Sequence, residues 1–245
     1  MDTNEAARTI AEPLGKVGMQ FYFTKHSAIA AQEVGIDAIL LYAGGRGGVI
    51  ADADAARVDE VFYFFAPGFM GSVAESAWST AGREVTVAKH LEASNAYATD
   101  TFGEVDPEVL TAFDEAATAL IASLPTGRWP IVDGYRAFEL PADLVQRTYR
   151  HTVVLRELRG GVHTECAAEA GLDPQVACRI DQDGAFYEIH GDGKPTEITP
   201  SEEEIALKRS VEAATSAAMV ELLEALDEAQ LEALVAGSLA FRAAL

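Results

Sequence analysis

Apolar residues recur every three or four positions along most of this chain of 245 residues, and this spacing constrains the fold more than any other feature. Residues 3–22 illustrate the pattern, because Ile10, Leu14, Val17 and Phe21 share one face when the segment is wound as a helix. The same spacing predicts further helices at 25–34, 37–44, 82–100, 106–123, 228–243 and, capped by Asp52 or Asp54, up to Phe65. The expected fold class is therefore mainly α.

Glycine and proline predict where these helices stop. The glycine-rich stretch "GGRGG", residues 44–48, predicts a loop. Pro125 and Gly127 predict a break, with irregular structure over 129–140. Pro141 then opens the helix that carries the most informative part of the sequence.

After that helix, the long helical pattern gives way to shorter segments. Residues 163–180 divide into two short helical segments around Gly171, in the order of a helix-turn-helix. The following "GAFYEIHGDGKPTEITPSEEE" alternates around Gly191-Asp192-Gly193, which predicts one small β-hairpin. We therefore expect a helical domain at 1–140, a winged-helix-like part at 141–210 and C-terminal helices at 211–245, with a single compact unit as the alternative.

The C-terminal region begins at a predicted cap, for which Ser201 and Thr199 are the two candidates. A stripe follows with the spacing of one helix face, formed by Met219, Leu222, Leu223 and Leu226. This stripe is compatible with a homodimer built through the C-terminal helices, and equally with packing inside one chain.

The net charge of −21 bears on the class of partner. Proteins that bind nucleic acid place Lys and Arg on phosphates, yet residues 144–245 contain 9 basic and 18 acidic residues. A DNA-binding regulator of the winged-helix type is therefore the disfavoured alternative, and we expect no nucleic-acid partner.

Other features of the sequence restrict the expected cellular location and the expected state of the cysteines. We expect no membrane partner, because no window is long and apolar enough to span a bilayer. The polar, acidic start "MDTNEAARTIAEP" does not read as a signal peptide, which favours the cytoplasm. Two cysteines, Cys166 and Cys178, favour reduced core thiols over a disulfide or a zinc cluster.

The stretch "RTYRHTVVLRELRGGVHTEC", residues 147–166, sets charged side chains among apolar ones. We expect Gly160 or Gly161 to end the helix and His163 to fold back over that end. Arginine offers a planar fork for an anion, and histidine moves protons near neutral pH. The candidate catalytic residues are His163, His151 and Arg159, with Arg156 as a ligand-binding residue. The alternative is purely structural, with arginines that pair with carboxylates and histidines that stabilise the helix end.

Four more residues are candidates for ligand binding. Tyr22 and His26 flank a predicted helix start, Arg46 belongs to the glycine-rich stretch, and Phe65 belongs to the aromatic run "VFYFFAPGFM", which suits a pocket wall. A haem or metal site would have to be assembled from His26, His151 and His163. No metal or cofactor motif is present, so the cofactor stays unknown and no metal ligand is assigned.

Three segments, "EPLGKVGMQFYFTKH", "GRGGVIADADAARVDEVFYFFAPGFM" and "YRHTVVLRELRGGVHTECAAEAGL", resemble a largely uncharacterised family of actinobacterial helix-turn-helix proteins. The strongest shared motif is Leu-Arg-Glu-x-Arg-Gly-x-x-His, which starts at Leu155 and ends at His163. The resemblance implies the fold more than a function. Gly161 stands where the family usually has Asp, which weakens any transfer of chemistry that used this Asp. The segment after the second short helix is shorter, which weakens a DNA-binding role.

These observations together favour a small-molecule-binding protein or enzyme, expected in specialised metabolism. Its buried Arg/His site would hold an anionic or polar ligand and carry out acid–base chemistry, either without a cofactor or with the help of a metal.

Overall fold

The computed structural model describes residues 1–181 and 199–245. Every regular element in these residues is a helix, so the expectation of a mainly α protein is confirmed. The predicted β-hairpin falls on 184–198, outside the described residues, and a winged-helix-like part is not supported because the described residues contain no strand.

The central element is α9 (Leu144–Ala170), a helix of 27 residues that crosses the molecule. Five helices pack along it: α1 (Thr3–Gln20), α6 (Arg83–Phe102), α7 (Pro107–Ser123), α8 (Pro130–Arg136) and α11 (Glu202–Leu223). Because these neighbours surround α9, most of its middle turns are buried on every side. This is why its sequence reads as neither a surface helix nor an apolar core helix.

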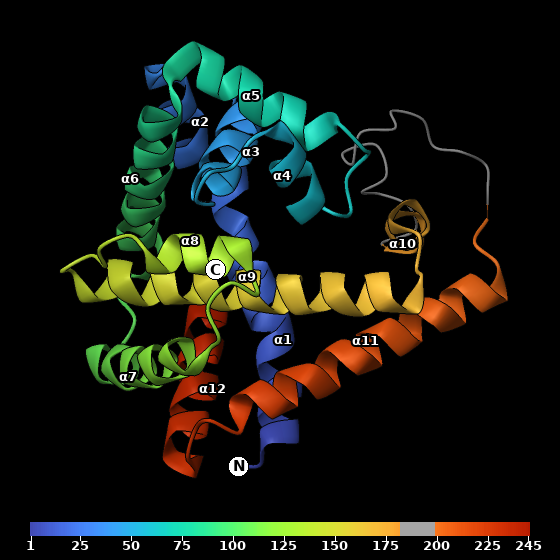
Figure 1. Ribbon diagram of the computed structural model, residues 1–245. Helices are drawn as coiled ribbons and strands as arrows, with labels where there is room; N and C mark the ends of the chain where they lie inside the picture. Colours follow the sequence, from blue (N-terminus) through green and yellow to red (C-terminus); the bar gives the residue numbers. More distant parts are fainter. Residues whose placement is uncertain (182–198) are drawn as a thin grey trace.

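Apart from α1, α8 and α10, the other helices form two groups on opposite sides of α9 (Figure 1). One group consists of α2 (Lys25–Glu33), α3 (Ala38–Gly48), α4 (Ala55–Val61) and α5 (Phe69–Ala81), together with α6. The other consists of α7, α11 and α12 (Glu228–Ala243), with α12 packed on α7 and α1. The chain ends meet there, since the amino group of Met1 lies 2.8 Å from the Glu228 carboxylate.

One hydrophobic cluster runs from Ala6 to Phe241 and includes residues of both groups. A smaller cluster joins the end of α9, α10 (Pro174–Ile180) and α11 through Ala167, Val176 and Val211. Met219, Leu223 and Leu226, three of the four residues of the predicted apolar stripe, are buried inside the chain. The homodimer and the division at 140 and 210 stay predictions.

The glycine-rich loop at 44–48 is a wrong prediction, because these residues form the last turns of α3. A Cβ on Gly44 would lie 2.6 Å from Ala77 of α5, and one on Gly48 would lie 2.5 Å from Val87 of α6. The glycines therefore allow α3 to approach two neighbouring helices closely, which is a packing role and not a turn.

The prediction of a helix end at Gly160-Gly161 is also wrong. The helix α9 continues through both residues and is capped by Gly171, whose φ is 68°. A Cβ on Gly161 would lie 2.6 Å from the Trp129 ring, so that glycine gives the indole room to pack against the helix. The first of the two predicted short segments is consequently the end of α9, and α10 is the second.

Two further predictions concern the segments beside α9, of which the second is confirmed. Residues 129–140 are not wholly irregular, because Pro130 begins the short helix α8, where a proline at the first position leaves no hydrogen bond unmade. Ser201, one of the two predicted caps, accepts a hydrogen bond from the Glu204 backbone and starts α11. None of the described helices is long and apolar enough to cross a membrane.

Candidate functional site

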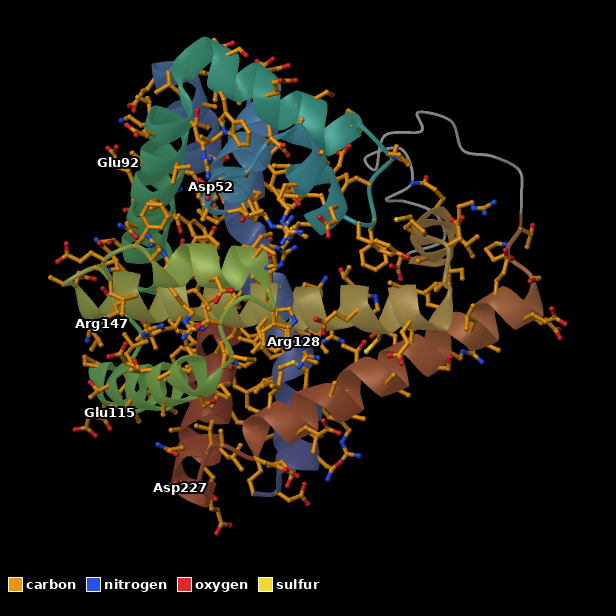
Figure 2. The ribbon with its side chains drawn as sticks, viewed as in Figure 1. Asp52, Glu92, Glu115, Arg128, Arg147 and Asp227 are labelled. Atoms are coloured by element: carbon orange, nitrogen blue, oxygen red, sulfur yellow. The ribbon has the colours of Figure 1, made fainter. Side chains whose placement is uncertain are left out.

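A cavity of about 520 Å³ opens between α1, α3, α4, the segment 62–65, the start of α8, and α9. Its walls combine six aromatic side chains with a cluster of charged ones. Figure 2 shows Arg128, one of the lining residues, beside α9 where the two groups of helices meet. The volume is in the range of pockets that hold a small organic molecule.

The stretch singled out in the sequence forms one wall. Arg156, Gly160 and His163 follow each other at spacings of four and three on α9, with Arg159 adjacent, so they share the face that lines the cavity. This alignment exists only because the helix continues through Gly160. Nothing lies within 4 Å of the position that a Gly160 Cβ would occupy, so the cavity reaches the helix backbone there.

Two arginines share one buried carboxylate in this wall. Arg46 donates from Nε and Nη2 to the Glu157 carboxylate, at 2.9 and 2.7 Å. Arg156 donates from Nη1 to Glu157 Oε1 at 2.6 Å. Gly18 of α1 leaves room for the stem of Arg156, because a Cβ there would approach it to 2.9 Å. Burial alone would raise the pKa of Glu157, but the charges of Arg156 and Arg46 lower it to about 2.

An aromatic wall faces this cluster. The Arg46 guanidinium lies 4.3 Å from the centre of the Phe62 ring and donates to the Tyr42 hydroxyl at 3.0 Å. Phe65 packs against both rings, with centroids 5.8 Å from Phe62 and 6.2 Å from Tyr42. Since a guanidinium stacks on aromatic faces, these rings also hold Arg46 in place.

His163 is positioned from outside the cavity by α11. Its Nδ1 lies 3.0 Å from the Thr215 hydroxyl oxygen, and that hydroxyl donates to the Val211 carbonyl at 2.8 Å. The hydroxyl has one proton, so Nδ1–H of His163 must be the donor, which leaves Nε2 as an acceptor. The His163 ring stacks on Phe64 with centroids 5.2 Å apart.

Burial lowers the pKa of His163, and the nearby charges of Arg159 and Lys208 lower it further, against an opposing effect of Glu212. The imidazole is therefore neutral at pH 7 and available to accept a proton. Arg159 donates to the Glu212 carboxylate at 3.1 Å, so the same residue of α11 acts on both side chains.

The rim carries two more arginines, each with a carboxylate of its own. Arg128 makes two hydrogen bonds to Glu165, at 3.1 and 2.9 Å, and Arg57 pairs with Glu60 at 2.5 Å. The described lining contains five arginines and three glutamates in all. In a chain with a net charge of −21, this is a local excess of positive charge.

Five of the eight predicted site residues line the cavity: Phe65, Arg46, Arg156, Arg159 and His163. Tyr22 lies behind the wall, with its ring centroid 4.7 Å from that of Tyr42. His151 and His26 lie elsewhere. His151 contacts Asp114 and Thr118 of α7, and His26 contacts Asp100 of α6.

The three histidines proposed for a haem or metal site thus have separate surroundings. No group of three or more His, Cys, Asp or Glu that could hold a metal ion occurs in the described residues.

Sequence reasoning missed several lining residues, among them Tyr42, Trp129 and Gly15. Trp129 lies in the segment that was predicted to be irregular, so no pattern pointed to it. The sequence did offer a reason to single out Gly15, because glycine within a helix is unfavourable unless packing or function requires it. Nothing lies within 4 Å of the position of a Gly15 Cβ, as at Gly160, and both glycines line the cavity.

The fold and site define a mainly helical protein with a cationic, aromatic cavity against its central helix. A family model described as a helix-turn-helix family matches residues 7–189, most of the chain, and the protein therefore belongs to that family. No curated protein and no solved structure matches. The two C-terminal helices α11 and α12 lie outside the matched range, although Thr215 and Glu212 of α11 contact the site.

Proposed function

We propose that this protein binds a small organic anion with an apolar body in the cavity beside α9. The observation that carries the proposal is the gathering of five guanidinium groups and six aromatic side chains around one cavity of about 520 Å³. The acidic group of the ligand is held by Arg156 and Arg159, and its body packs against Phe62 and Phe65. Arginine forks match carboxylate and phosphate oxygens, and aromatic rings supply apolar contact.

His163 gives this site a route to chemistry. Its side chain lines the cavity, Nδ1 is held by Thr215, and Nε2, the acceptor, lies 3.8 Å from Glu212 Oε1. An imidazole fixed in one tautomer is suited to take a proton from a bound molecule and to return it. If the protein is an enzyme, we infer acid–base catalysis by His163, with Arg159 stabilising negative charge. His151 has no part in this proposal, because it is not among the lining residues.

The binding proposal can be tested with 1-anilinonaphthalene-8-sulfonate, a fluorescent aromatic anion, and N-phenyl-1-naphthylamine, which has the same body without the sulfonate. We expect Arg159→Met to weaken sulfonate binding on the order of tenfold or more, because a charge-assisted contact is lost. Binding of the neutral amine should be unchanged. The control is Arg242→Met, since Arg242 pairs with Glu12 on α1, and neither residue lines the cavity.

Gly160→Leu supplies a second variant, because its side chain projects into open space and should block both probes while α9 stays intact. The proposal is wrong if neither probe binds, or if Arg159→Met affects both probes equally.

A DNA-binding function is the second candidate, because the family description fits it at least as well. Against it, none of the seven residues of α10 is exposed. Arg179 is the sole basic residue of α10, and acidic Asp173 and Asp181 flank the helix. A recognition helix needs an exposed, basic face.

Fluorescence anisotropy with a labelled random duplex at low salt separates the two candidates. We expect no binding that weakens with added salt, whereas a DNA-binding protein loses affinity steeply as salt rises.

A further inference from the structure

A second feature of α9 is Arg150, an arginine that pairs with no carboxylate of residues 1–181 and 199–245. Arg150 is 3% exposed, and among the described residues it contacts the Asn95 side-chain oxygen at 3.3 Å and the Tyr135 ring at 5.8 Å. Burial lowers the pKa of Arg150, the reverse of the effect that a neighbouring carboxylate has on Arg46. Arginine nevertheless keeps its proton at neutral pH, so a positive charge is buried there without a described counter-charge.

Arg150 is linked to the cavity by a row of aromatic and polar side chains. The Tyr135 hydroxyl lies 2.9 Å from His90 Nε2. The His90 ring stacks on Tyr22 with centroids 5.8 Å apart, and Tyr22 packs against Tyr42 of the cavity wall at 4.7 Å. Arg150 and Arg156 are six residues apart on α9, a rise of about 9 Å along the helix axis. A charge still acts over about this distance in a protein interior, so the Arg150 charge acts on a molecule in the cavity although Arg150 does not line it.

The charges of this region do not balance among the described residues. Each outer arginine of the cavity has its own carboxylate: Arg57 has Glu60, Arg128 has Glu165 and Arg159 has Glu212. The inner group consists of three arginines, Arg46, Arg150 and Arg156, and one carboxylate, Glu157. Its net charge is therefore two positive charges.

The titratable neighbours of this inner group do not supply the missing negative charge. Burial lowers the pKa of His90 to about 3, so its ring is neutral. Burial also raises the pKa of Tyr135 to about 12 and that of Tyr22 well above its ordinary value, so neither hydroxyl is ionised. A buried charge without a partner is costly, and such residues are kept where they serve a function.

We propose that the ligand of this cavity is an organic dianion, and that Arg150 is a specificity-determining residue for its second negative charge. This inference rests on the proposed function and narrows its ligand class to an aromatic dicarboxylate or a comparable doubly charged oxyanion with an apolar body. A dianion brings the inner group to neutrality, whereas a monoanion leaves one charge uncompensated. At a separation near 10 Å in a protein interior, one charge changes affinity on the order of tenfold.

The test is displacement of the bound naphthalene sulfonate by three ring compounds that differ in charge: benzamide, benzoate and isophthalate. We expect isophthalate to displace the probe at a concentration about tenfold lower than benzoate, with benzamide weakest. Arg150→Met should bring isophthalate and benzoate close together, and Arg150→Lys should keep most of the difference. The control is Arg147→Met, because Arg147 lies on the same helix and is paired with Asp114.

A stability measurement separates this role from a structural one. Removing an unpaired buried charge should raise the melting temperature of ligand-free Arg150→Met, whereas loss of a structural contact should lower it. The inference is overturned if isophthalate is no better than benzoate on the unaltered protein, if Arg150→Met keeps the difference, or if that variant melts at a lower temperature. If the sulfonate probe itself does not bind, the proposed function fails and takes this inference with it.

Discussion

At the scale of single residues, the Glu157 carboxylate neutralises two buried guanidinium groups, because it accepts hydrogen bonds from both Arg46 and Arg156. Glu157→Gln leaves two buried guanidinium groups facing each other, and breaking a buried pair in this way costs about 3–5 kcal/mol of unfolding free energy. Urea titration at pH 7 measures the loss. A cost below about 1 kcal/mol, typical of exposed pairs, would contradict the buried role.

The same residue predicts a pH dependence whose sign follows from its low pKa. The folded value of about 2 lies below the ordinary 4.5, so the unfolded chain binds the proton more readily. The stabilisation by Glu157 is complete above pH 4.5 and is lost as the pH falls towards 2. We therefore expect the stability difference between the unaltered protein and Glu157→Gln to narrow over that range. A difference that stays constant down to pH 3 would argue against the assignment.

At the scale of the element, α9 contains two adjacent glycines with opposite roles. Gly160 has open space, so Gly160→Ala should gain about 0.5–1 kcal/mol from better helix propensity. Gly161 lies under the Trp129 ring, where a Cβ would come to 2.6 Å, so Gly161→Ala should lose about 1–2 kcal/mol despite the same gain in propensity. Urea titrations of both variants provide the measurement, each variant being the control of the other. Equal effects would mean that Trp129 does not pack as described.

The elements also show what the sequence allowed us to predict. Helix spacing identified α1, α6, α7 and α12, because each buries one face and leaves the other exposed. The glycines of α3 and α9 were misread as stops, since the sequence does not show that Ala77 or Trp129 will approach the backbone. The candidate site was predicted to a similar extent: neighbours in the sequence were recognised as one site, and residues of distant segments were not. Residues of one stretch, Arg156 to His163, were found together, whereas Trp129 and Tyr42 come from distant segments and could not be connected to it.

At the scale of the whole molecule, the cavity and the surface have opposite charge. Acidic side chains such as Glu92, Glu115 and Asp227 lie on the outside (Figure 2), and the chain carries a net charge of −21. The arginines at the rim are paired with carboxylates, so an approaching anion meets the repulsion of the whole molecule before it reaches the unbalanced inner group. Under the proposed function, the negative surface therefore slows the entrance of the anion, while the buried positive charge retains it once bound.

This opposition predicts an unusual salt dependence of binding rates. Salt shortens the reach of surface charge from about 30 Å at 0.01 M to about 10 Å at 0.1 M, and acts much less on buried groups. We expect the association rate constant of the naphthalene sulfonate to rise several-fold between these concentrations, with little change in its dissociation rate. Stopped-flow fluorescence measures both rates, and the neutral naphthylamine is the control. An association rate that falls with salt would show that the rim arginines, not the acidic surface, govern the approach.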